Sequence, residues 1–302
     1  MRIFITGASG YIGGAVAAAL ARAGHSVTGL VRSEARAHEA ARNEVRAVIG
    51  SLEEPRGWLE MARESEVLIH CAAEFSPRMQ ELDGRAIDGL IEAAKSARRP
   101  RLIVYTSGCW LYGNTGGTAV DEAAALTPFP VVTWRVAHEE KILAADSGPV
   151  RVIVFRPGCV YGGRGGLTAT WFESATKEGA ARLVGDGRSR WTMVHVEDLA
   201  QAYLRAVESP WRREVFNVSD RSRFTTGECA EAASRAAGAD GKVLRIPLDE
   251  AAKQMGGFAE ALAADQHIDA SKAVRLLGWQ PRHGGFVDGV DRYYLAWKAG
   301  AV

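Results

Sequence analysis

A glycine-rich segment directly behind the first predicted strand constrains this chain more than any other feature. Residues 2–6 form a short apolar run, and residues 11–23 form an Ala-rich helical stretch. The pattern Gly-x-x-Gly-x-x-Gly between them is made by Gly7, Gly10 and Gly13. The first glycine permits a tight turn, the second lets backbone approach a phosphate, and the third lets the helix pack closely on the strand. Because the helix start also offers free N–H groups, and a second strand is predicted at residues 26–31, the segment predicts a dinucleotide pyrophosphate site.

Composition narrows the class of protein. The 302 residues suffice for one large or two modest domains, and 47% of them are hydrophobic, enough for a sizeable core. A formal net charge of +1 without a long basic run argues against a nucleic-acid partner. No apolar run is long enough to span a membrane and the chain opens on a strand, so we expect a cytoplasmic protein without a membrane partner. The four cysteines lie far apart, without ligand-spaced histidines, and predict neither a metal site nor disulfides.

Apolar, β-rich runs alternate with helical patterns through the first half of the chain. The runs cover residues 45–49, 67–70, 102–106 and 152–155, and the helical patterns include residues 82–97 and 134–145. This alternation predicts an α/β fold with a doubly wound, Rossmann-like parallel sheet. From Tyr161 the sequence turns glycine-rich and irregular, which predicts a smaller C-terminal substrate region. We expect a dinucleotide-binding domain over residues 1–165, with 193–218 returning to it, and a substrate-binding region over 166–192 and 219–302.

Seven fragments stand in a fixed order along nearly the whole chain. They are TGASGYIG (6–13), HCAA (70–73), YTSGCWLYG (105–113), FRPGCVYG (155–162), MVHVEDLAQAY (193–203), FNVSD (216–220) and LGWQP (277–281). Together they resemble the extended short-chain dehydrogenase/reductase family, an NAD-dependent epimerase/dehydratase-like group that includes nucleotide-sugar epimerases and dehydratases. The resemblance implies a dinucleotide cofactor at the carboxyl ends of the strands, where ligands of open α/β sheets bind.

The resemblance also implies which positions hold that cofactor. They are Gly7, Ser9, Gly10, Tyr11, Ile12 and Gly13 for the pyrophosphate, Ser51, Leu52, Cys71, Ala72 and Ala73 for the adenine and its ribose, and Thr106, Pro157, Gly158 and Val160 for the nicotinamide. Arg32 follows the second strand, where NAD-preferring relatives carry an Asp and this chain has Val31. A 2′-phosphate would find a cation there, so we expect NADP, with NAD as the alternative cofactor and a solvated surface arginine as the alternative interpretation of Arg32.

The catalytic pair of the family is replaced in this chain. Relatives carry Tyr-x-x-x-Lys with a Glu four residues beyond the Lys, and alignment on Glu139 gives Val131-x-x-x-Arg135. The family pair works because residues at i and i+4 share a helix face and the ammonium lowers the pKa of the phenol. Arg135 keeps a charge that can bind the nicotinamide ribose, but Val131 transfers no proton. Neighbouring registers, which bring Val136 or His138 to the Lys position, also lack a Tyr.

Other hydroxyl groups are therefore candidates to polarise a substrate. The family Ser or Thr, four residues before a Tyr-Gly pair, corresponds to Gly108, and Ser107 stands next to it. Tyr112 and Tyr161 belong to two Tyr-Gly pairs and would otherwise pack and orient backbone. We expect Ser107 or Tyr112, together with Arg135, to form the catalytic site. Asp83 takes the place of a further family Asn.

Aromatic residues suggest the kind of substrate. We expect six of them on loops near the nicotinamide: Phe75, Trp110, Trp134, Trp171, Phe172 and Trp191. Such a group suits a flat apolar substrate better than a sugar diphosphate, although any one of them would also serve to fill a domain interface. His195 matches a position that usually supports the fold, and we interpret it as structural.

The sequence thus predicts an NADP(H)-dependent oxidoreductase that reduces a carbonyl, imine or activated alkene on a small, largely apolar metabolite. Two alternatives stay open. A nucleotide-sugar epimerase or dehydratase would depend on the missing Tyr, and a catalytically silent NAD(P)-sensing regulator would need no proton donor. The expected partner is a small-molecule substrate, and the oligomeric state is open, with a homodimer as one option.

Overall fold

The computed structural model describes residues 1–96 and 99–300, and the chain packs into two compact units. The first unit consists of Met1–Ser107, Trp134–Arg156 and Ala200–Phe216, and the second of Gly108–Thr133, Pro157–Leu199 and Asn217–Val302. The domain boundaries expected from the sequence stay a prediction. None of the helices in the described part of the chain combines the length and the apolar character that crossing a bilayer requires.

The first unit is built on a seven-stranded sheet, counted over the described residues. Its strands are β1 (Arg2–Thr6), β2 (Ser26–Val31), β3 (Arg46–Ile49), β4 (Val67–His70), β5 (Arg101–Thr106), β7 (Val150–Pro157) and β11 (Glu214–Val218). They lie in the order β11-β7-β5-β4-β1-β2-β3, and the pairs from β7 to β3 are parallel. The strand order reverses between β1 and β4, which is the switch point where such sheets bind ligands. The predicted doubly wound, Rossmann-like α/β fold is confirmed.

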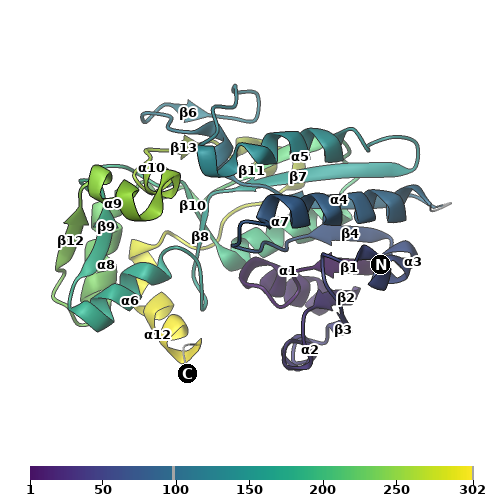
Figure 1. Ribbon diagram of the computed structural model, residues 1–302, viewed down its shortest axis with the longest axis horizontal. Coiled ribbons are helices and arrows are strands. Elements are labelled where there is room, and N and C mark those ends of the chain that lie inside the picture. The colour runs from purple at the N-terminus through teal and green to yellow at the C-terminus, as the bar shows by residue number, and fades with distance from the viewer. Residues whose placement is uncertain (97–98, 301–302) are drawn as a thin grey trace. The chain divides into compact units, whose positions relative to one another are not determined.

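Helices connect these strands. They are α1 (Tyr11–Arg22), α2 (Glu34–Ala41), α3 (Leu59–Glu64), α4 (Met79–Lys95), α5 (Trp134–Leu143) and α7 (Val196–Glu208). The α4 and α5 helices lie side by side (Figure 1). The helix expected over residues 82–97 begins at Met79, and its expected end at residue 97 lies outside the described residues. The buried strip of α4 includes both apolar residues and Asp83, so this helix carries a charge into the interior.

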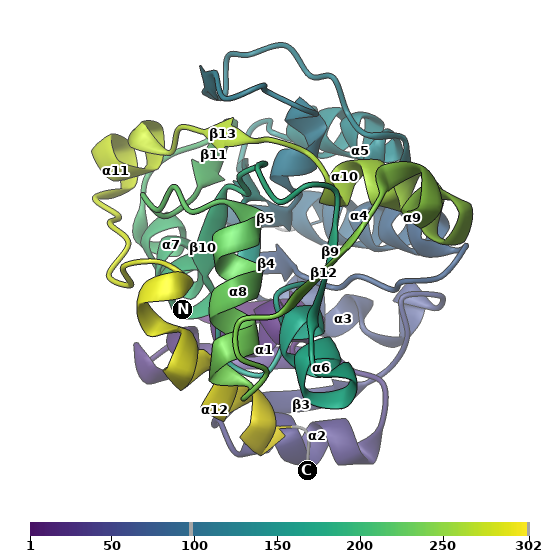
Figure 2. The ribbon, with the colours of Figure 1, turned by 90° about the vertical axis from the view of Figure 1, so that its left-hand side faces the viewer.

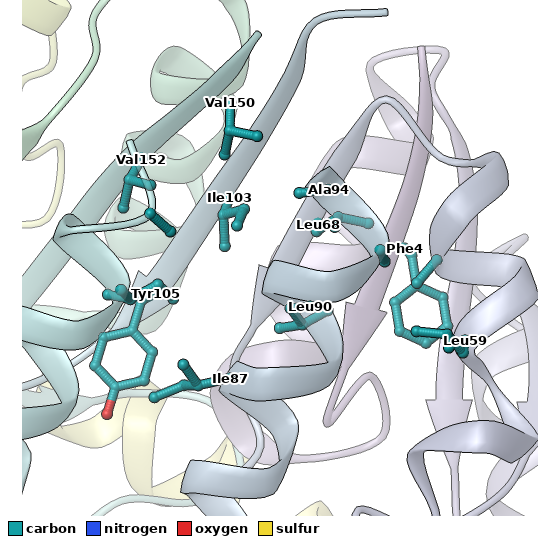
Figure 3. Close-up of a cluster of buried hydrophobic side chains, with 14 of the residues drawn as sticks. Phe4, Leu59, Leu68, Ile87, Leu90, Ala94, Ile103, Tyr105, Val150 and Val152 are labelled. Atoms are coloured by element: carbon teal, nitrogen blue, oxygen red, sulfur yellow. The ribbon is translucent and has the colours of Figure 1, made fainter. Parts of the chain in front are cut away.

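An apolar cluster fixes α4 against the strands. Phe4, Leu68 and Ile103 come from β1, β4 and β5, and Leu90 comes from α4 (Figure 3). All four are fully buried, and burial of such side chains is the main force that orders the layer. The ring of Tyr105 belongs to the same cluster, while its hydroxyl lies at the end that points away from Leu68 (Figure 3). The Tyr105 hydroxyl is therefore a polar group at the edge of the apolar cluster, near the carboxyl end of β5.

The second unit contains three two-stranded parallel sheets in its described residues. The pairs are β6 (Ala119–Val120) with β13 (His267–Ile268), β8 (Cys159–Tyr161) with β10 (Met193–His195), and β9 (Ala181–Val184) with β12 (Val243–Ile246). Its helices are α6 (Ala169–Glu178), α8 (Thr226–Ala236), α9 (Leu248–Met255), α10 (Gly257–Leu262), α11 (Ser271–Leu277) and α12 (Val290–Gly300). The α8 helix contacts α6, α12 and β9 (Figure 2), and a capping box of Thr225 and Glu228 defines its start.

Candidate active site

The glycine loop after β1 has the geometry that a pyrophosphate needs. Gly7 has a φ of +76°, and a Cβ on it would lie 2.7 Å from the backbone of Ala72. A Cβ on Gly13 would lie 2.2 Å from the Gly7 carbonyl oxygen, so α1 packs against the loop only because residue 13 lacks a side chain. Gly10 occupies the N-cap of α1 and no side chain caps this helix start, which is the kind of helix end at which anions bind. The loop therefore fits a dinucleotide.

The other positions of the first unit that we expect to bind the cofactor follow strand ends. Arg32 follows β2, Ser51 and Leu52 come shortly after β3, and Cys71 to Ala73 follow β4. Because these strands are parallel, their carboxyl ends form one edge of the sheet. Burial raises the pKa of the Cys71 thiol to about 11, so this cysteine is not a nucleophile at neutral pH.

Thr106 ends β5, and other groups already engage its hydroxyl. It donates to the main-chain oxygen of His70 at 2.6 Å and is paired with the Tyr203 hydroxyl at 2.6 Å. In the second unit, Gly158 makes a close backbone approach, since a Cβ there would lie 2.6 Å from the Thr192 main-chain oxygen. These contacts explain why the two positions suit small or hydrogen-bonded residues, and their role toward the nicotinamide stays a prediction.

Arg32 has a partner that the sequence did not indicate. Its side chain is 80% exposed, and Nη1 lies 3.8 Å from an Oε of Glu74. Glu74 comes from the loop between β4 and α4, more than forty residues further along the chain. A carboxylate thus lies beside the cation that we expect to bind a 2′-phosphate.

A buried carboxylate gathers the polar side chains between the strand ends, α4 and α5. Asp83 accepts from His138 Nδ1 at 2.7 Å, the Tyr105 hydroxyl at 2.9 Å and His70 Nε2 at 3.3 Å. With Nε2 as donor, His70 Nδ1 accepts from the Thr6 hydroxyl at 2.6 Å. Burial opposes the charge, but the hydrogen bonds from the two histidines outweigh it and hold the pKa of Asp83 well below its ordinary value.

Arg135 lies at the edge of this cluster, in the first turn of α5. Its Nη1 donates to the Tyr105 hydroxyl and to the Thr106 main-chain oxygen, both at 3.3 Å, and lies 4.0 Å from Asp83. The guanidinium carbon lies 4.5 Å from the ring centroid of Trp134, a cation–π contact. Arg135 is therefore a fixed cation at the carboxyl end of β5.

Ser107 and Tyr112 differ in what their hydroxyl groups contact. Ser107 is 8% exposed, and its Oγ is fully shielded without a hydrogen-bond partner among the described residues. The Tyr112 hydroxyl donates to Asn217 Oδ1 at 2.8 Å in the core of the second unit. Tyr161 is fully buried among Phe286 and other rings, and burial raises its pKa far above the ordinary value. The hydroxyls of Ser107 and Tyr161 thus both lack a hydrogen-bond partner among the described residues, but Tyr161 is enclosed by aromatic rings, whereas Ser107 directly follows β5.

Val131 and Arg135 do not lie on one helix. Val131 belongs to a short 3₁₀ turn, Pro130–Val132, whereas α5 begins at Trp134. In the second unit, Val131 lies against Gly257, whose added Cβ would be 3.7 Å from a Val131 methyl group. That these two residues stand where relatives carry the Tyr and the Lys stays a prediction.

A pocket of about 380 Å³ lies within the second unit, lined by α6, β9, α9 and α10. Its apolar lining is Leu167, Trp171, Leu183, Val184, Trp191, Ile246, Met255, Phe258 and Leu262. The rings of Trp171 and Trp191 stack with centroids 5.1 Å apart. Its charged residues pair with one another, because Lys177 binds Glu173 at 2.6 Å and Arg182 lies 3.5 Å from Glu178. The pocket is therefore lined largely by apolar side chains, and neither Lys177 nor Arg182 is an unpaired cation that could bind a diphosphate.

The aromatic residues expected as one group on loops are distributed differently. Trp171 and Phe172 lie on α6, and Phe172 packs into the core against Phe286 and Trp297. Phe75 is 90% exposed on the loop after β4. The expectation of a single group on loops was wrong, because composition does not show which side of a helix an aromatic residue occupies. Only Trp171 and Trp191 of the six line the pocket.

A pair of histidines in the second unit was also not foreseen. His195 and His283 stack with centroids 3.5 Å apart and planes 16° apart, and Glu197 lies close enough for the three to be considered as metal ligands. Imidazole lone pairs lie in the ring planes, so stacked rings do not direct them toward one ion. His195 Nδ1 also accepts from the Glu197 main-chain N–H at 3.2 Å. The geometry favours a stacked pair over a metal site, in line with a structural His195.

Comparisons with known proteins agree with this architecture. The model of the NAD dependent epimerase/dehydratase family matches residues 3–219. The chain is 28% identical over 300 residues to a ceramide reductase of Caulobacter vibrioides, covering 95% of this chain and 88% of that protein. It is 26% identical over 307 residues to a UDP-glucose 4-epimerase of Mycolicibacterium smegmatis, covering 93% and 94%. A crystal structure of UDP-glucose 4-epimerase with UDP-glucose from Thermotoga maritima aligns over 100% of both chains, with a TM-score of 0.84 at 20% identity, a likeness of fold.

Proposed function

Because this chain belongs to the NAD dependent epimerase/dehydratase family, we propose that it is an NADP(H)-dependent reductase of a small, largely apolar carbonyl, imine or activated alkene. The family and the glycine loop support a dinucleotide cofactor. The direction of the reaction, the substrate class and the choice of NADP over NAD are parts of the proposal.

The observation that carries it is the unpaired hydroxyl of Ser107. A buried hydroxyl without a partner costs about 1–3 kcal/mol, and a substrate oxygen that accepts its hydrogen bond would offset this cost. The residue follows β5, at the edge of the sheet where the cofactor positions lie. We therefore assign Ser107 to polarise the substrate and leave Tyr112 in its hydrogen bond to Asn217.

Reduction suits these residues better than epimerisation. Oxidising a sugar hydroxyl requires a base to take its proton, and neither Val131 nor a serine of ordinary acidity supplies one. Reduction of a carbonyl requires hydride at carbon and a proton at oxygen, and water can provide that proton. A bound nicotinamide would supply the hydride, Arg135 would bind the nicotinamide ribose, and Ser107 would hold the substrate oxygen.

The pocket of the second unit supports an apolar substrate. Its stacked Trp171 and Trp191 offer flat apolar surface, and its charged residues are paired with one another. The ceramide reductase relative is a reductase by name, and the epimerase relative keeps the nucleotide-sugar reaction as the competing proposal.

A substrate panel tests the proposal. NADPH consumption is followed by its absorbance with aryl ketones, long-chain ketones, quinones and cyclic imines, while UDP-glucose is assayed separately for epimerisation. We expect consumption with at least one apolar compound and no conversion of UDP-glucose. Epimerisation of UDP-glucose would replace the proposal with the nucleotide-sugar reaction. Tight NADPH binding with no turnover of any compound would favour a cofactor-sensing regulator.

A further inference from the structure

Asp83 connects three strand ends to two helices through side chains alone. It lies on α4 and accepts hydrogen bonds from Tyr105 at the end of β5, His70 at the end of β4 and His138 on α5. His70 in turn bonds to Thr6, the residue directly before the glycine loop. A residue that is 5% exposed thus holds together much of the sheet edge that faces the cofactor positions.

The charge of Asp83 has one permanent counter-charge close by. His70 and His138 are hydrogen-bond partners of the carboxylate, whereas the guanidinium of Arg135 is a cation at every pH at which the protein is folded. Arg135 lies 4.0 Å from the carboxylate and donates to the Tyr105 hydroxyl, which donates to Asp83. An unpaired buried charge is costly for either partner, so the carboxylate and the guanidinium stabilise each other through this hydroxyl.

A purely structural role would not require a carboxylate. An asparagine at residue 83 could still accept from His138 and hydrogen-bond Tyr105, and α4 would stay tied to α5. What an amide cannot supply is a negative charge facing the guanidinium. The carboxylate keeps this charge in a site that burial disfavours, which indicates that the charge itself has a use.

We propose that Asp83 is the positioning residue for Arg135, and that it acts through the Tyr105 hydroxyl to hold the guanidinium where the nicotinamide ribose of the cofactor binds. This inference rests on the proposed function, because it needs a dinucleotide whose second ribose meets Arg135. Asp83 itself contacts no part of the cofactor. Asp83 therefore affects the binding of the nicotinamide half of the cofactor and not of its adenine half.

The test compares a whole cofactor with its adenine half. Dissociation constants of NADPH and of 2′,5′-ADP are measured by calorimetry for the wild type, Asp83→Asn and Tyr105→Phe. Asp88→Asn is the matched control, since it makes the same substitution on the same helix and removes only an exposed ion pair to Lys141. Losing a charge-assisted contact should raise the NADPH constant about tenfold in Asp83→Asn and about threefold in Tyr105→Phe.

The 2′,5′-ADP constant should stay within about twofold in every variant, and Asp88→Asn should match the wild type for both ligands. Adding Asp83→Asn to Arg135→Met should weaken NADPH binding no further than Arg135→Met alone, because both act through one contact.

If Asp83→Asn weakens the binding of NADPH and of 2′,5′-ADP equally, Asp83 has a structural role and the proposal is overturned. An unchanged NADPH dissociation constant would overturn it too. If Asp83→Asn fails to fold, Tyr105→Phe decides by the same comparison. A wild type that binds NADPH no more tightly than 2′,5′-ADP would overturn this inference and the proposed cofactor role of Arg135 together, and that failure is visible without any variant.

Discussion

Two buried carboxylates, one in each unit, respond to burial in opposite ways. Asp83 is 5% exposed and Asp220 is 8% exposed. Asp83 has three hydrogen-bond donors and a guanidinium around it, and its pKa lies well below the ordinary value. Asp220 accepts from the main-chain N–H and hydroxyl of Ser222 at 2.9 and 2.6 Å, yet burial raises its pKa to about 6.

The difference shows that surroundings, more than depth, decide whether a buried acid stays charged. Tyr161 and the carboxylate of Asp198 are also near Asp220, and the second carboxylate disfavours its charge. The first unit therefore keeps a permanent negative charge, which can hold Arg135. The second unit holds an acid that changes charge near neutral pH. Substitutions that remove one of these groups at a time test this difference.

The largest expected effect is on stability at neutral pH. Asp83→Leu removes the acceptor of three donors and leaves Arg135 without its counter-charge, which should lower the free energy of unfolding by about 3–5 kcal/mol. Asp220→Asn should cost less than about 1 kcal/mol, because the amide oxygen still accepts from Ser222. Urea unfolding at pH 7 measures both, and similar losses in the two variants would break the contrast.

The pH dependence of stability should separate the units. Asp220 has a raised pKa, so its contribution is present below the ordinary 3.8 and is lost as pH rises through about 6. Burial and then His283 lower the pKa of His195 to about 4, so its contribution is present above 6.5 and is lost as pH falls through about 4. Asp83 contributes equally across this window, because its pKa lies below it.

In the wild type, the titrations of Asp220 and His195 change the free energy of unfolding in opposite directions. Removing one group should therefore reveal the pH dependence that the other contributes. From pH 6.5 to 4, Asp220→Asn should lose up to about 3 kcal/mol of unfolding free energy, and His195→Asn should gain up to about 3 kcal/mol. Unfolding curves at several pH values give both slopes. Curves parallel to the wild type in both variants would show that neither group titrates in this window.

The same contrast between paired and unpaired groups applies to hydroxyls. Ser107→Ala should lower kcat about 10- to 100-fold without changing the NADPH dissociation constant, since its unpaired hydroxyl is the group proposed to hold the substrate oxygen. Tyr112→Phe should leave kcat within about threefold and cost about 1 kcal/mol of stability, since its hydroxyl is bonded to Asn217. The reverse pattern would assign the polarising role to Tyr112 instead of Ser107.

The smallest effect on stability concerns an exposed charge pair, the opposite extreme from Asp83. Glu74→Gln should change the unfolding free energy by less than about 0.5 kcal/mol and tighten NADPH binding about twofold by releasing Arg32. Arg32→Ala should weaken NADPH about tenfold and leave NADH unchanged. An unchanged ratio of the two affinities in Arg32→Ala would remove the argument for NADP.

The sequence was most informative where the requirement is local. The turn at Gly7 and the close approach at Gly13 involve residues a few positions apart, so their spacing alone predicted the loop. Alternating runs predicted the doubly wound sheet for the same reason. The position of Ser107 in a motif made it a candidate. The absence of a partner for its hydroxyl could not be predicted, because it depends on side chains from elsewhere in the fold.

Groups assembled from distant positions could not be predicted in this way. The sequence shows that Asp83 takes the place of a family Asn, but it does not show the partners of this residue. Its contacts with residues 70, 105 and 138 exist only because β4, β5 and α5 meet beside α4. Glu74 near Arg32, and the stacked His195 and His283, arise similarly. In each case the interacting residues are separated by at least 13 positions, and no periodic pattern links them.

In the proposed reaction, this chain transfers hydride from NADPH to an apolar carbonyl without the family's Tyr. The most direct measurement uses NADPH labelled with deuterium at either face of nicotinamide C4 and the ketone most active in the panel, with mass spectrometry of the product. We predict that one labelled cofactor, and not the other, places deuterium on the new carbinol carbon, with a much slower reaction in Ser107→Ala. An unlabelled product from both cofactors, or conversion of UDP-glucose with the nicotinamide retained, would contradict the proposal.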